Sequence, residues 1–286
     1  MTTLVLGCNG QLGAALAATA PQASEWAGLG FAELDITDWD ALRTICRDIK
    51  PTTIVNAAAY TAVDAAESTT AIAKAVNTDG PANIAAVADE IGARMIHVST
   101  DFVFDGTATT PYLPDTKPNP LSVYGKTKYD GEQAVLNTLP ESAFVVRTAW
   151  LYSVTGNNFV KTMLRLMRER DELSVVADQR GTPTWANSLA EAVWAATTAT
   201  DAAGTFHWTD DGEATWHEFA VAIQVQALEL GLLDNEIPIN AITSDQYPTA
   251  AHRPSYSVLD CTSTQEVLDL RPAHWRENLR QMLTML

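Results

Sequence analysis

Short apolar runs recur along the first half of the chain, separated by longer stretches whose apolar residues have a helical spacing. Runs without polar alternation indicate strands buried on both faces of a sheet. We predict such strands at residues 4–6, 53–56, 95–99 and 144–148, with a weaker one at 26–29. Helices that can cross between parallel strands are predicted at residues 40–47, 71–91 and 123–136. This alternation predicts an α/β fold, a doubly wound parallel sheet of the Rossmann type, over residues 1–150.

The rhythm of the pattern changes after Trp150, so residues 151–286 are expected to form mainly a smaller C-terminal α/β substrate-binding domain. The helix near residues 186–199 is expected to pack back on the first domain. Turn residues are dense at 105–120 and 201–212, and Pro238, Pro248 and Pro254 indicate loops. Helices are predicted at residues 158–170, 188–199, 215–230 and 275–286, and a short strand at 173–177.

Three glycines follow the first predicted strand, and an alanine-rich helical stretch at 14–18 comes directly after them. Gly7 allows a tight turn, Gly10 allows backbone to approach a pyrophosphate, and Gly13 allows the helix to pack closely on the strand. The helix N-terminus then faces the anion. This order of strand, glycines and helix predicts a dinucleotide-binding site.

A phenol and an ammonium lie four residues apart at Tyr124 and Lys128, on one face of a predicted helix. We expect a short loop to join this helix to the strand at 95–99, so that the pair lies at the carboxyl edge of the sheet. Lys128, together with the charge of an oxidised nicotinamide, is expected to lower the pKa of Tyr124. Tyr124 would then act as the general acid in reduction of a ketone.

A second hydroxyl is needed to hold the oxygen on which charge develops. Ser99 and Thr100 end the strand at 95–99 and could supply it, although either hydroxyl could equally cap the strand end.

The composition limits the partners. Acidic residues outnumber basic ones by 35 to 18, and the net charge of −17 repels nucleic acid and anionic membranes. Three scattered cysteines indicate reduced thiols. Because a strand begins at residue 2 and no apolar run is long enough to span a membrane, we expect a cytoplasmic protein. The five histidines lack metal-ligand spacing, so no metal site is predicted, and His97 is expected to be a hydrogen-bonded core residue.

Motifs along nearly the whole chain resemble those of the dTDP-4-dehydrorhamnose reductase family, a group of extended short-chain dehydrogenases/reductases. Such a number of motifs in one order leaves little room for coincidence. They are residues 7–13 (GCNGQLG), 34–37 (LDIT), 56–64 (NAAAYTAVD), 99–106 (STDFVFDG), 124–128 (YGKTK), 147–150 (RTAW), 156–160 (GNNFV), 178–184 (DQRGTPT) and 253–254 (RP).

The resemblance implies reduction of the C4 ketone of dTDP-4-dehydro-β-L-rhamnose to dTDP-L-rhamnose, for polysaccharide biosynthesis, with NADPH or NADH as cofactor. It implies that Thr100, Tyr124 and Lys128 are the catalytic set. Val103 and Trp150 could equally be core residues. The implied cofactor-binding residues are Gly7, Gly10, Gln11, Leu12, Asp35, Ile36, Ala57, Ala58, Tyr60, Tyr124 and Lys128. The implied substrate-binding residues are Thr100, Val103, Trp150 and Asn158.

The chain departs from the family pattern at three places. At Gly30 and Phe31, after the second strand, it has neither the carboxylate that selects NAD nor the cation that selects NADP, so we expect both cofactors to work. A modest preference for NADPH would follow if Arg43 reached the adenosine ribose. Ala15 replaces a glutamate that helps some members to hold magnesium between subunits, which implies a monomer or weak homodimer. Tyr256 stands where asparagine is usual.

Two other functions remain open. The first is a reductase or epimerase of another nucleotide-4-ketosugar, because the shape of the substrate pocket cannot be inferred from motif spacing. The second is a reductase-like regulatory subunit without turnover, against which the intact Thr100, Tyr124 and Lys128 argue.

Overall fold

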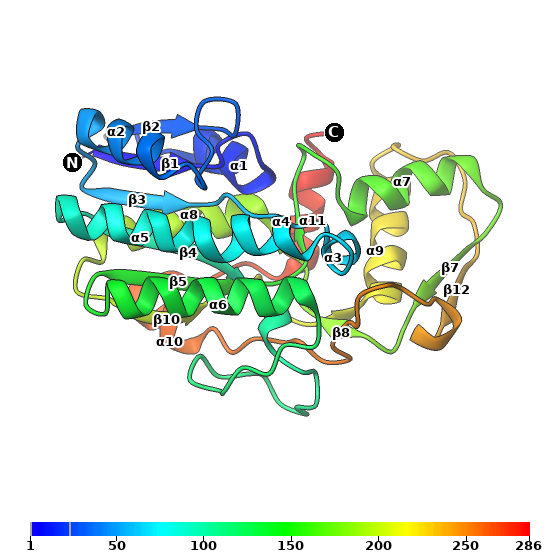
Figure 1. Cartoon of the computed structure of the whole chain (residues 1–286). Helices are drawn as coiled ribbons and strands as arrows, with labels where there is room; N and C mark the ends of the chain where they lie inside the picture. The colour runs from blue at the N-terminus through cyan, green and yellow to red at the C-terminus, as the bar shows by residue number, and fades with distance from the viewer. Residues whose placement is uncertain (1, 23) are drawn as a thin grey trace.

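In a computed structural model of the chain, which describes residues 2–22 and 24–286, parallel strands form a six-stranded sheet (Figure 1). The order across the sheet is β10-β5-β4-β3-β1-β2, so β1 lies next to an edge strand and the chain winds away from it in both directions. The α/β prediction and the five predicted strands are confirmed. The strands are β1 (Thr2–Leu6), β2 (Glu25–Leu29), β3 (Thr53–Asn56), β4 (Arg94–Thr100), β5 (Ala143–Thr148) and β10 (Gly204–His207).

The sixth strand corrects the expectation of a turn cluster at residues 201–212. Strand β10 pairs in parallel with β5 at the edge of the sheet. The ring of Phe206 stacks on that of Phe144 with their centroids 4.0 Å apart. Because this short strand is held by a partner about 60 residues away, its local composition gave no sign of it.

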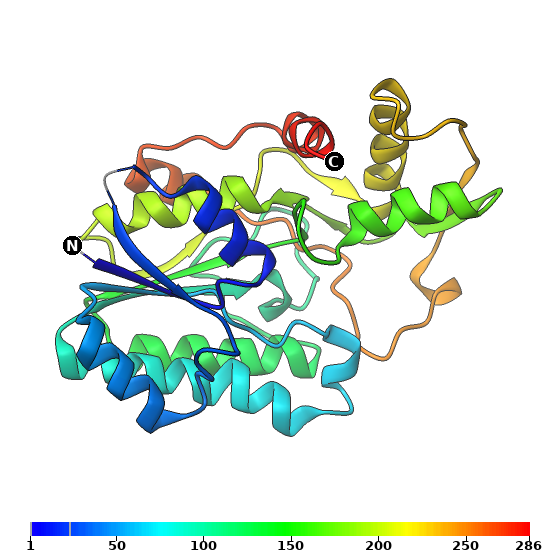
Figure 2. The same ribbon diagram turned by 90° about the horizontal axis from the view of Figure 1, so that it is seen from above.

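Helices cover both faces of the sheet (Figure 2). On one face α1 (Gln11–Thr19) packs against α8 (Ala186–Thr198), and the indole nitrogen of Trp194 donates to the carbonyl of Leu16 at 3.0 Å. The other face carries α2 (Trp39–Ile49), α5 (Gly80–Ile91) and α6 (Val123–Thr138). The helix predicted at 71–91 is present as α4 (Thr70–Lys74), a π-helical turn (Ala75–Asp79) and α5.

A second hydrophobic core forms beyond Trp150, between α7 (Phe159–Glu169), α9 (Trp216–Glu229) and α11 (Trp275–Leu283). Beside it, β7 (Leu173–Val176) pairs in parallel with β12 (Ile239–Ile242). Strand β12 corrects the expectation of loops alone around the prolines, and again its partner is distant in the sequence. Because α8 and β10 return to the first sheet, the chain passes between the two cores more than once.

Short elements complete the fold. Within the described ranges, no helix is both long and apolar enough to cross a membrane. The short elements are α3 (Val63–Ala66), η2 (Asp101–Val103), β6 (Leu151–Tyr152), β8 (Arg180–Gly181), β9 (Thr184–Trp185), β11 (Ala214–Thr215), η3 (Ser244–Gln246) and α10 (Thr262–Leu268).

Candidate active site

The turn after β1 has no room for a side chain at Gly7. Gly7 has a φ of +82°, which residues with a Cβ rarely adopt. A Cβ at Gly7 would also lie 2.6 Å from the backbone nitrogen of Ala58, at the end of the neighbouring strand β3. At Gly7 the turn therefore presents only backbone.

The N-terminus of α1 follows this turn. Gly10 is the N-cap and gives no side-chain hydrogen bond, and the first turn has no acidic residue. The first amides of the helix are thus left to attract an anion. Leu12 is buried in the core, so it can reach a ligand only through its backbone. Gln11 Oε1 accepts a hydrogen bond from Asn158 Nδ2 at 3.0 Å, which links the glycine turn to the C-terminal region.

The loop after β2 holds the predicted adenine-side residues. Asp35 Oδ1 accepts from the amide of Thr37 at 2.9 Å, and Ile36 is buried. Glu33 Oε2 accepts from the amide of Gly30 at 2.9 Å. Gly30 and Phe31 themselves carry no carboxylate, as the sequence indicates, but the turn at 30–33 brings the carboxylate of Glu33 to this strand end. The strand-end pattern alone did not indicate it.

The segment after β3 is fixed by buried amides. Asn56 Oδ1 accepts from the amide of Ala58 at 3.1 Å, and its Nδ2 lies 3.1 Å from His97 Nδ1. The prediction that His97 is a hydrogen-bonded core residue is confirmed. Asn77 Oδ1 accepts from the amide of Tyr60 at 2.8 Å. These bonds fix the backbone of residues 57–60 beside the glycine turn.

Helix α6 begins close to the carboxyl end of β4. Ser122 caps the helix by accepting from the amide of Gly125 at 3.1 Å. A Cβ at Gly125 would lie 2.1 Å from the carbonyl oxygen of Phe102, so only glycine lets α6 pack this closely on η2. The short loop predicted between β4 and α6 is wrong, because residues 101–122 intervene. Packing, and not loop length, brings α6 to the sheet edge.

Tyr124 and Lys128 are both buried on α6. Burial raises the pKa of Tyr124 to about 12, while the Thr100 hydroxyl beside it acts in the opposite direction. Lys128 Nζ donates to the carbonyl of Val98 at 2.7 Å, and burial lowers the pKa of Lys128 to about 8. The predicted lowering of the Tyr124 pKa by Lys128 is therefore wrong for the protein without cofactor, where desolvation of the phenol is the larger effect.

Of the two candidate hydroxyls, Thr100 is the one beside Tyr124. Thr100 Oγ1 also donates to Asp101 Oδ1 at 3.0 Å and accepts from the amide of Phe102 at 3.2 Å. Ser99 Oγ is buried and has no hydrogen-bond partner among the described residues. The structure thus brings Thr100, Tyr124 and Lys128 into one cluster.

The predicted substrate residues lie on both sides of the boundary between the two cores. Val103 is fully buried in a small apolar cluster. Trp150 has a φ of +45° and stacks on Trp216, with ring centroids 3.6 Å apart. Asn158 caps α7 by accepting from the amide of Lys161 at 3.1 Å. Among these residues, Trp150 alone has its backbone in the left-handed region, a strained conformation for a residue with a bulky side chain.

Two ion pairs near the cluster were not predicted. Arg147 on β5 pairs with Glu132 on α6, with Nη2 2.7 Å from Oε2, and both side chains are buried. A charged residue within a buried apolar strand was the available signal. Arg253 Nη2 lies 2.7 Å from Asp64 Oδ2 and ties the segment at 253–257 to α3. Tyr256, where the family has asparagine, is partly buried in that segment.

The residues named for the cofactor preference and for magnesium have other contacts. Arg43 Nε lies 2.7 Å from Glu90 Oε2, so Arg43 is paired on the surface between α2 and α5. Ala15 is buried in the core. Among residues 2–22 and 24–286, no group of three or more His, Cys, Asp or Glu side chains could hold a metal ion. Independence from metal stays a prediction.

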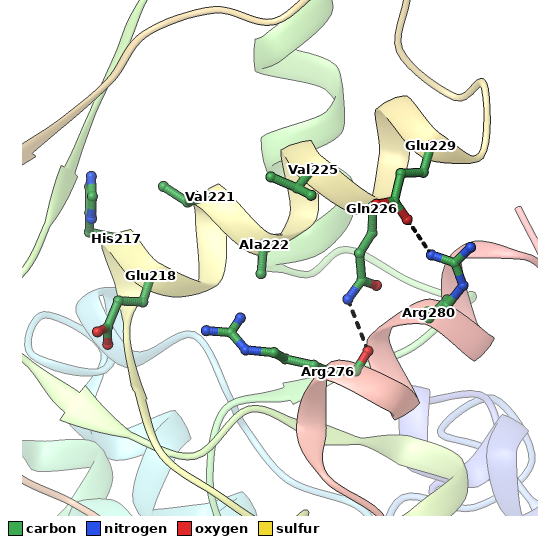
Figure 3. A pocket seen from close by; sticks show the side chains of 9 residues that line it. All are labelled: His217, Glu218, Val221, Ala222, Val225, Gln226, Glu229, Arg276 and Arg280. Atoms are coloured by element: carbon green, nitrogen blue, oxygen red, sulfur yellow. Dashed lines mark hydrogen bonds and ion pairs between the residues drawn. The ribbon is translucent and has the colours of Figure 1, made fainter.

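A cavity of about 420 Å³ lies elsewhere, between α9 and α11 (Figure 3). Val221 and Val225 line its middle, and the pair formed by Arg280 and Glu229, 2.6 Å apart, lies at one end. No residue of the predicted site lines this cavity.

Comparison with known proteins gives one consistent result. The family model described as the RmlD substrate binding domain matches residues 1–286. A dTDP-4-dehydrorhamnose reductase of Aggregatibacter actinomycetemcomitans is 40% identical over 98% of this chain and 97% of its own length.

Solved structures agree. A dTDP-4-dehydrorhamnose reductase of Clostridium acetobutylicum has a TM-score of 0.93 and 38% identity, covering 100% of this chain and 99% of its own. One from Bacillus anthracis, in complex with NADP, has a TM-score of 0.93 and 34% identity, covering 100% and 99%. A UDP-glucose 4-epimerase of Thermus thermophilus, covering 99% and 98%, is similar in fold at a TM-score of 0.83 but only 16% identical.

Proposed function

Because the chain belongs to the family of the RmlD substrate-binding domain, we propose that it reduces the C4 ketone of dTDP-4-dehydrorhamnose to dTDP-L-rhamnose with NADPH or NADH. The observation that carries the proposal is the buried cluster of Thr100, Tyr124 and Lys128, at the sheet edge that also bears the uncapped N-terminus of α1. An anion site and a proton donor side by side are what reduction of a ketone by a dinucleotide requires.

The residues at the sheet edge fit a dinucleotide. Gly7 and Gly10 leave the N-terminus of α1 open, and the amides from Gln11 onward face the pyrophosphate. The backbone fixed at Ala58 and Tyr60 borders the middle of the cofactor. When bound, the reduced nicotinamide supplies the hydride that goes to C4 of the sugar. The remaining residues assigned to the cofactor are Leu12, Asp35, Ile36, Ala57, Tyr124 and Lys128.

Tyr124 supplies the proton to the ketone oxygen. The raised pKa of Tyr124, about 12, keeps the phenol protonated at neutral pH, which is the form that a general acid needs. Thr100 holds the same oxygen by a hydrogen bond as charge develops on it. The low polarity around the two hydroxyls strengthens both interactions.

Lys128 acts on the cofactor ribose and on Tyr124. Among the described residues its Nζ bonds only the carbonyl of Val98, so two of its three hydrogens remain for ribose hydroxyls. Its pKa of about 8 leaves it mostly charged at neutral pH, and that charge favours the phenolate which forms as the proton leaves Tyr124.

The sugar nucleotide is held from the C-terminal region. Trp150 offers an aromatic face that is already fixed by Trp216. Asn158 connects this side to Gln11 on the cofactor side. Val103 contributes through the backbone, because its side chain is buried in the core.

The same proposal treats the enzyme as a monomer or weak homodimer in the cytoplasm. Cys8, Cys46 and Cys261 are free thiols, as in proteins of a reducing compartment. Ala15 offers no carboxylate for a metal bridge between subunits.

The test is oxidation of NADPH and of NADH, followed by absorbance, with a panel of nucleotide-4-ketosugars. We expect turnover with dTDP-4-dehydrorhamnose and at least about tenfold lower kcat/KM with other 4-ketosugars. Preference for another sugar would favour the alternative reductase or epimerase. Cofactor binding without turnover on any ketosugar would favour the regulatory subunit.

A further inference from the structure

The Thr100 hydroxyl has one hydrogen to donate and two lone pairs that can accept. In the structure the hydrogen is directed to Asp101 Oδ1, 3.0 Å away, and one lone pair accepts from the amide of Phe102. While Asp101 is ionised, Thr100 therefore offers a lone pair and not a hydrogen to the ketone oxygen. A lone pair in this place repels the charge that develops during reduction.

Asp101 is a buried acid without an oppositely charged partner among the described residues. Its side chain is 2% exposed and takes part in none of the ion pairs found over residues 2–22 and 24–286. Oδ2 is buried without a hydrogen bond of normal geometry. Burial raises the pKa of Asp101 to about 6, although the hydroxyls of Ser257 and Thr100 and the backbone amides of Asp101 and Phe102 favour its charged form. An unpaired buried charge is costly, and protonation removes it.

We propose that Asp101 is a positioning residue that acts through Thr100. In its neutral form Asp101 donates from Oδ1 to Thr100 Oγ1, which turns the hydrogen of Thr100 towards the ketone oxygen. Oδ2 is then a carbonyl oxygen, which tolerates the lack of a partner better than a carboxylate does. Tyr124 still transfers the proton, and Thr100 keeps its hydrogen throughout. The inference rests on the proposed function and adds a second acid to it.

Other titratable groups lie on β4, which Asp101 follows, and on α6, which packs against η2, and their ionisation has to be separated from that of Asp101 in the pH profile. Helix α6 contributes Tyr124, with its pKa of about 12, and Lys128, with its pKa of about 8. On β4, burial holds the pKa of His97 well below its usual range. The segment at 253–257 contributes Ser257, which does not titrate. The wild-type kcat/KM should therefore fall as pH rises through about 6, when Asp101 ionises, and again near 8, when Lys128 loses its charge.

The experiment compares pH profiles of kcat/KM for the wild type, Asp101→Asn and Asp101→Ala, with NADPH and dTDP-4-dehydrorhamnose. In Asp101→Asn the amide donates to Thr100 at every pH, so the fall near pH 6 should vanish and the fall near 8 should stay. Asp101→Ala leaves the Thr100 hydrogen without direction, and kcat/KM should be about tenfold lower across the range.

Asp210 provides the matched control. It is also buried, its pKa is also raised to about 6, and it accepts from the amide of Trp185 in the C-terminal region. Asp210→Asn should keep the wild-type profile. Thr100→Val provides a second test. Without the Thr100 hydroxyl, Asp101 cannot influence the ketone oxygen, so the residual kcat/KM should show no fall near pH 6.

The inference is overturned if Asp101→Asn retains the fall near pH 6, or if it is as inactive as Asp101→Ala while NADPH affinity stays normal. Should Asp101→Asn fail to fold, a fall near pH 6 that persists in Thr100→Val overturns the inference independently. Failure of the wild type to turn over any ketosugar would instead be a failure of the proposed function.

Discussion

Two buried carboxyl groups, one on helix α6 and one beside it, have different surroundings. Glu132, which is 0% exposed, accepts three hydrogen bonds from Arg147, at 2.7–3.2 Å. Asp101, which is 2% exposed, has no arginine or lysine partner among the described residues; the Thr100 hydroxyl donates to it at 3.0 Å, and the Ser257 hydroxyl also favours its charged form. A fully paired charge is fixed in one state, whereas a poorly paired acid can change its protonation at moderate pH.

The paired region, Glu132 with Arg147, stabilises the fold. Besides Glu132, Arg147 Nη1 donates to the carbonyl of Pro114 at 3.2 Å, and the guanidinium lies 5.2 Å from the ring centroid of Phe104. One side chain therefore joins β5 and α6 to the long segment between β4 and α6. The poorly paired region, Asp101 with Thr100, can instead change its protonation state. We infer that the first region stabilises the fold and that the second takes part in the chemistry.

The largest expected effect breaks the paired region. Glu132→Ala leaves the Arg147 charge buried without a partner, which should reduce the free energy of unfolding by about 3–5 kcal/mol, measured by urea denaturation. The control is Asp130→Ala on the same helix, which removes the exposed pair with Lys126 and should change stability by less than about 1 kcal/mol. Equal losses in the two variants would contradict the role given to Glu132.

A smaller effect concerns pH and the poorly paired region. The folded pKa of Asp101, about 6, lies above the ordinary value of ~3.9 in the unfolded chain, so its stabilising contribution is complete below pH ~4 and is lost as pH rises through about 6. Relative to Asp101→Asn, the wild type should lose up to about 3 kcal/mol of unfolding free energy between pH ~4 and ~7. Denaturant melts across this range measure the difference, and a constant difference would contradict it.

An exposed carboxylate gives a third point of comparison. Glu33 bonds the amide of Gly30 where the adenosine ribose would lie, so its charge should favour ribose hydroxyls and repel a 2′-phosphate. Glu33→Gln should raise the ratio of kcat/KM for NADPH to that for NADH by about three- to tenfold. The control is Asp38→Asn, which removes the charge of another acidic residue, at the N-terminus of α2. An unchanged ratio in Glu33→Gln would remove Glu33 from cofactor selection.

The smallest effect is expected from metal removal. A metal ion bound to either buried carboxyl group would change its charge pairing, and the comparison between Glu132 and Asp101 would no longer hold. Because no suitable cluster of ligands exists among the described residues, exhaustive chelation should leave turnover within about twofold of the untreated enzyme. Loss of activity that magnesium alone restored would show that a metal had been missed.

The pattern of the sequence predicted the sheet because strands buried on both faces are apolar throughout. The i, i+4 spacing identified Tyr124 and Lys128 because a helix places such residues on one face. The sequence pattern did not reveal β10, because this strand is stabilised by its pairing with β5, which is distant in the sequence. Nor did it reveal Asp101, because an aspartate after a strand usually indicates a turn, and burial is set by the whole fold.

The cluster at the sheet edge is the central claim, and Tyr124→Phe tests it most directly. This change keeps the ring and removes only the proton donor. With dTDP-4-dehydrorhamnose and NADPH, kcat should fall by about a hundredfold or more, while the Kd for NADPH stays within about threefold of the wild-type value. A kcat within a few-fold of the wild type would contradict the account.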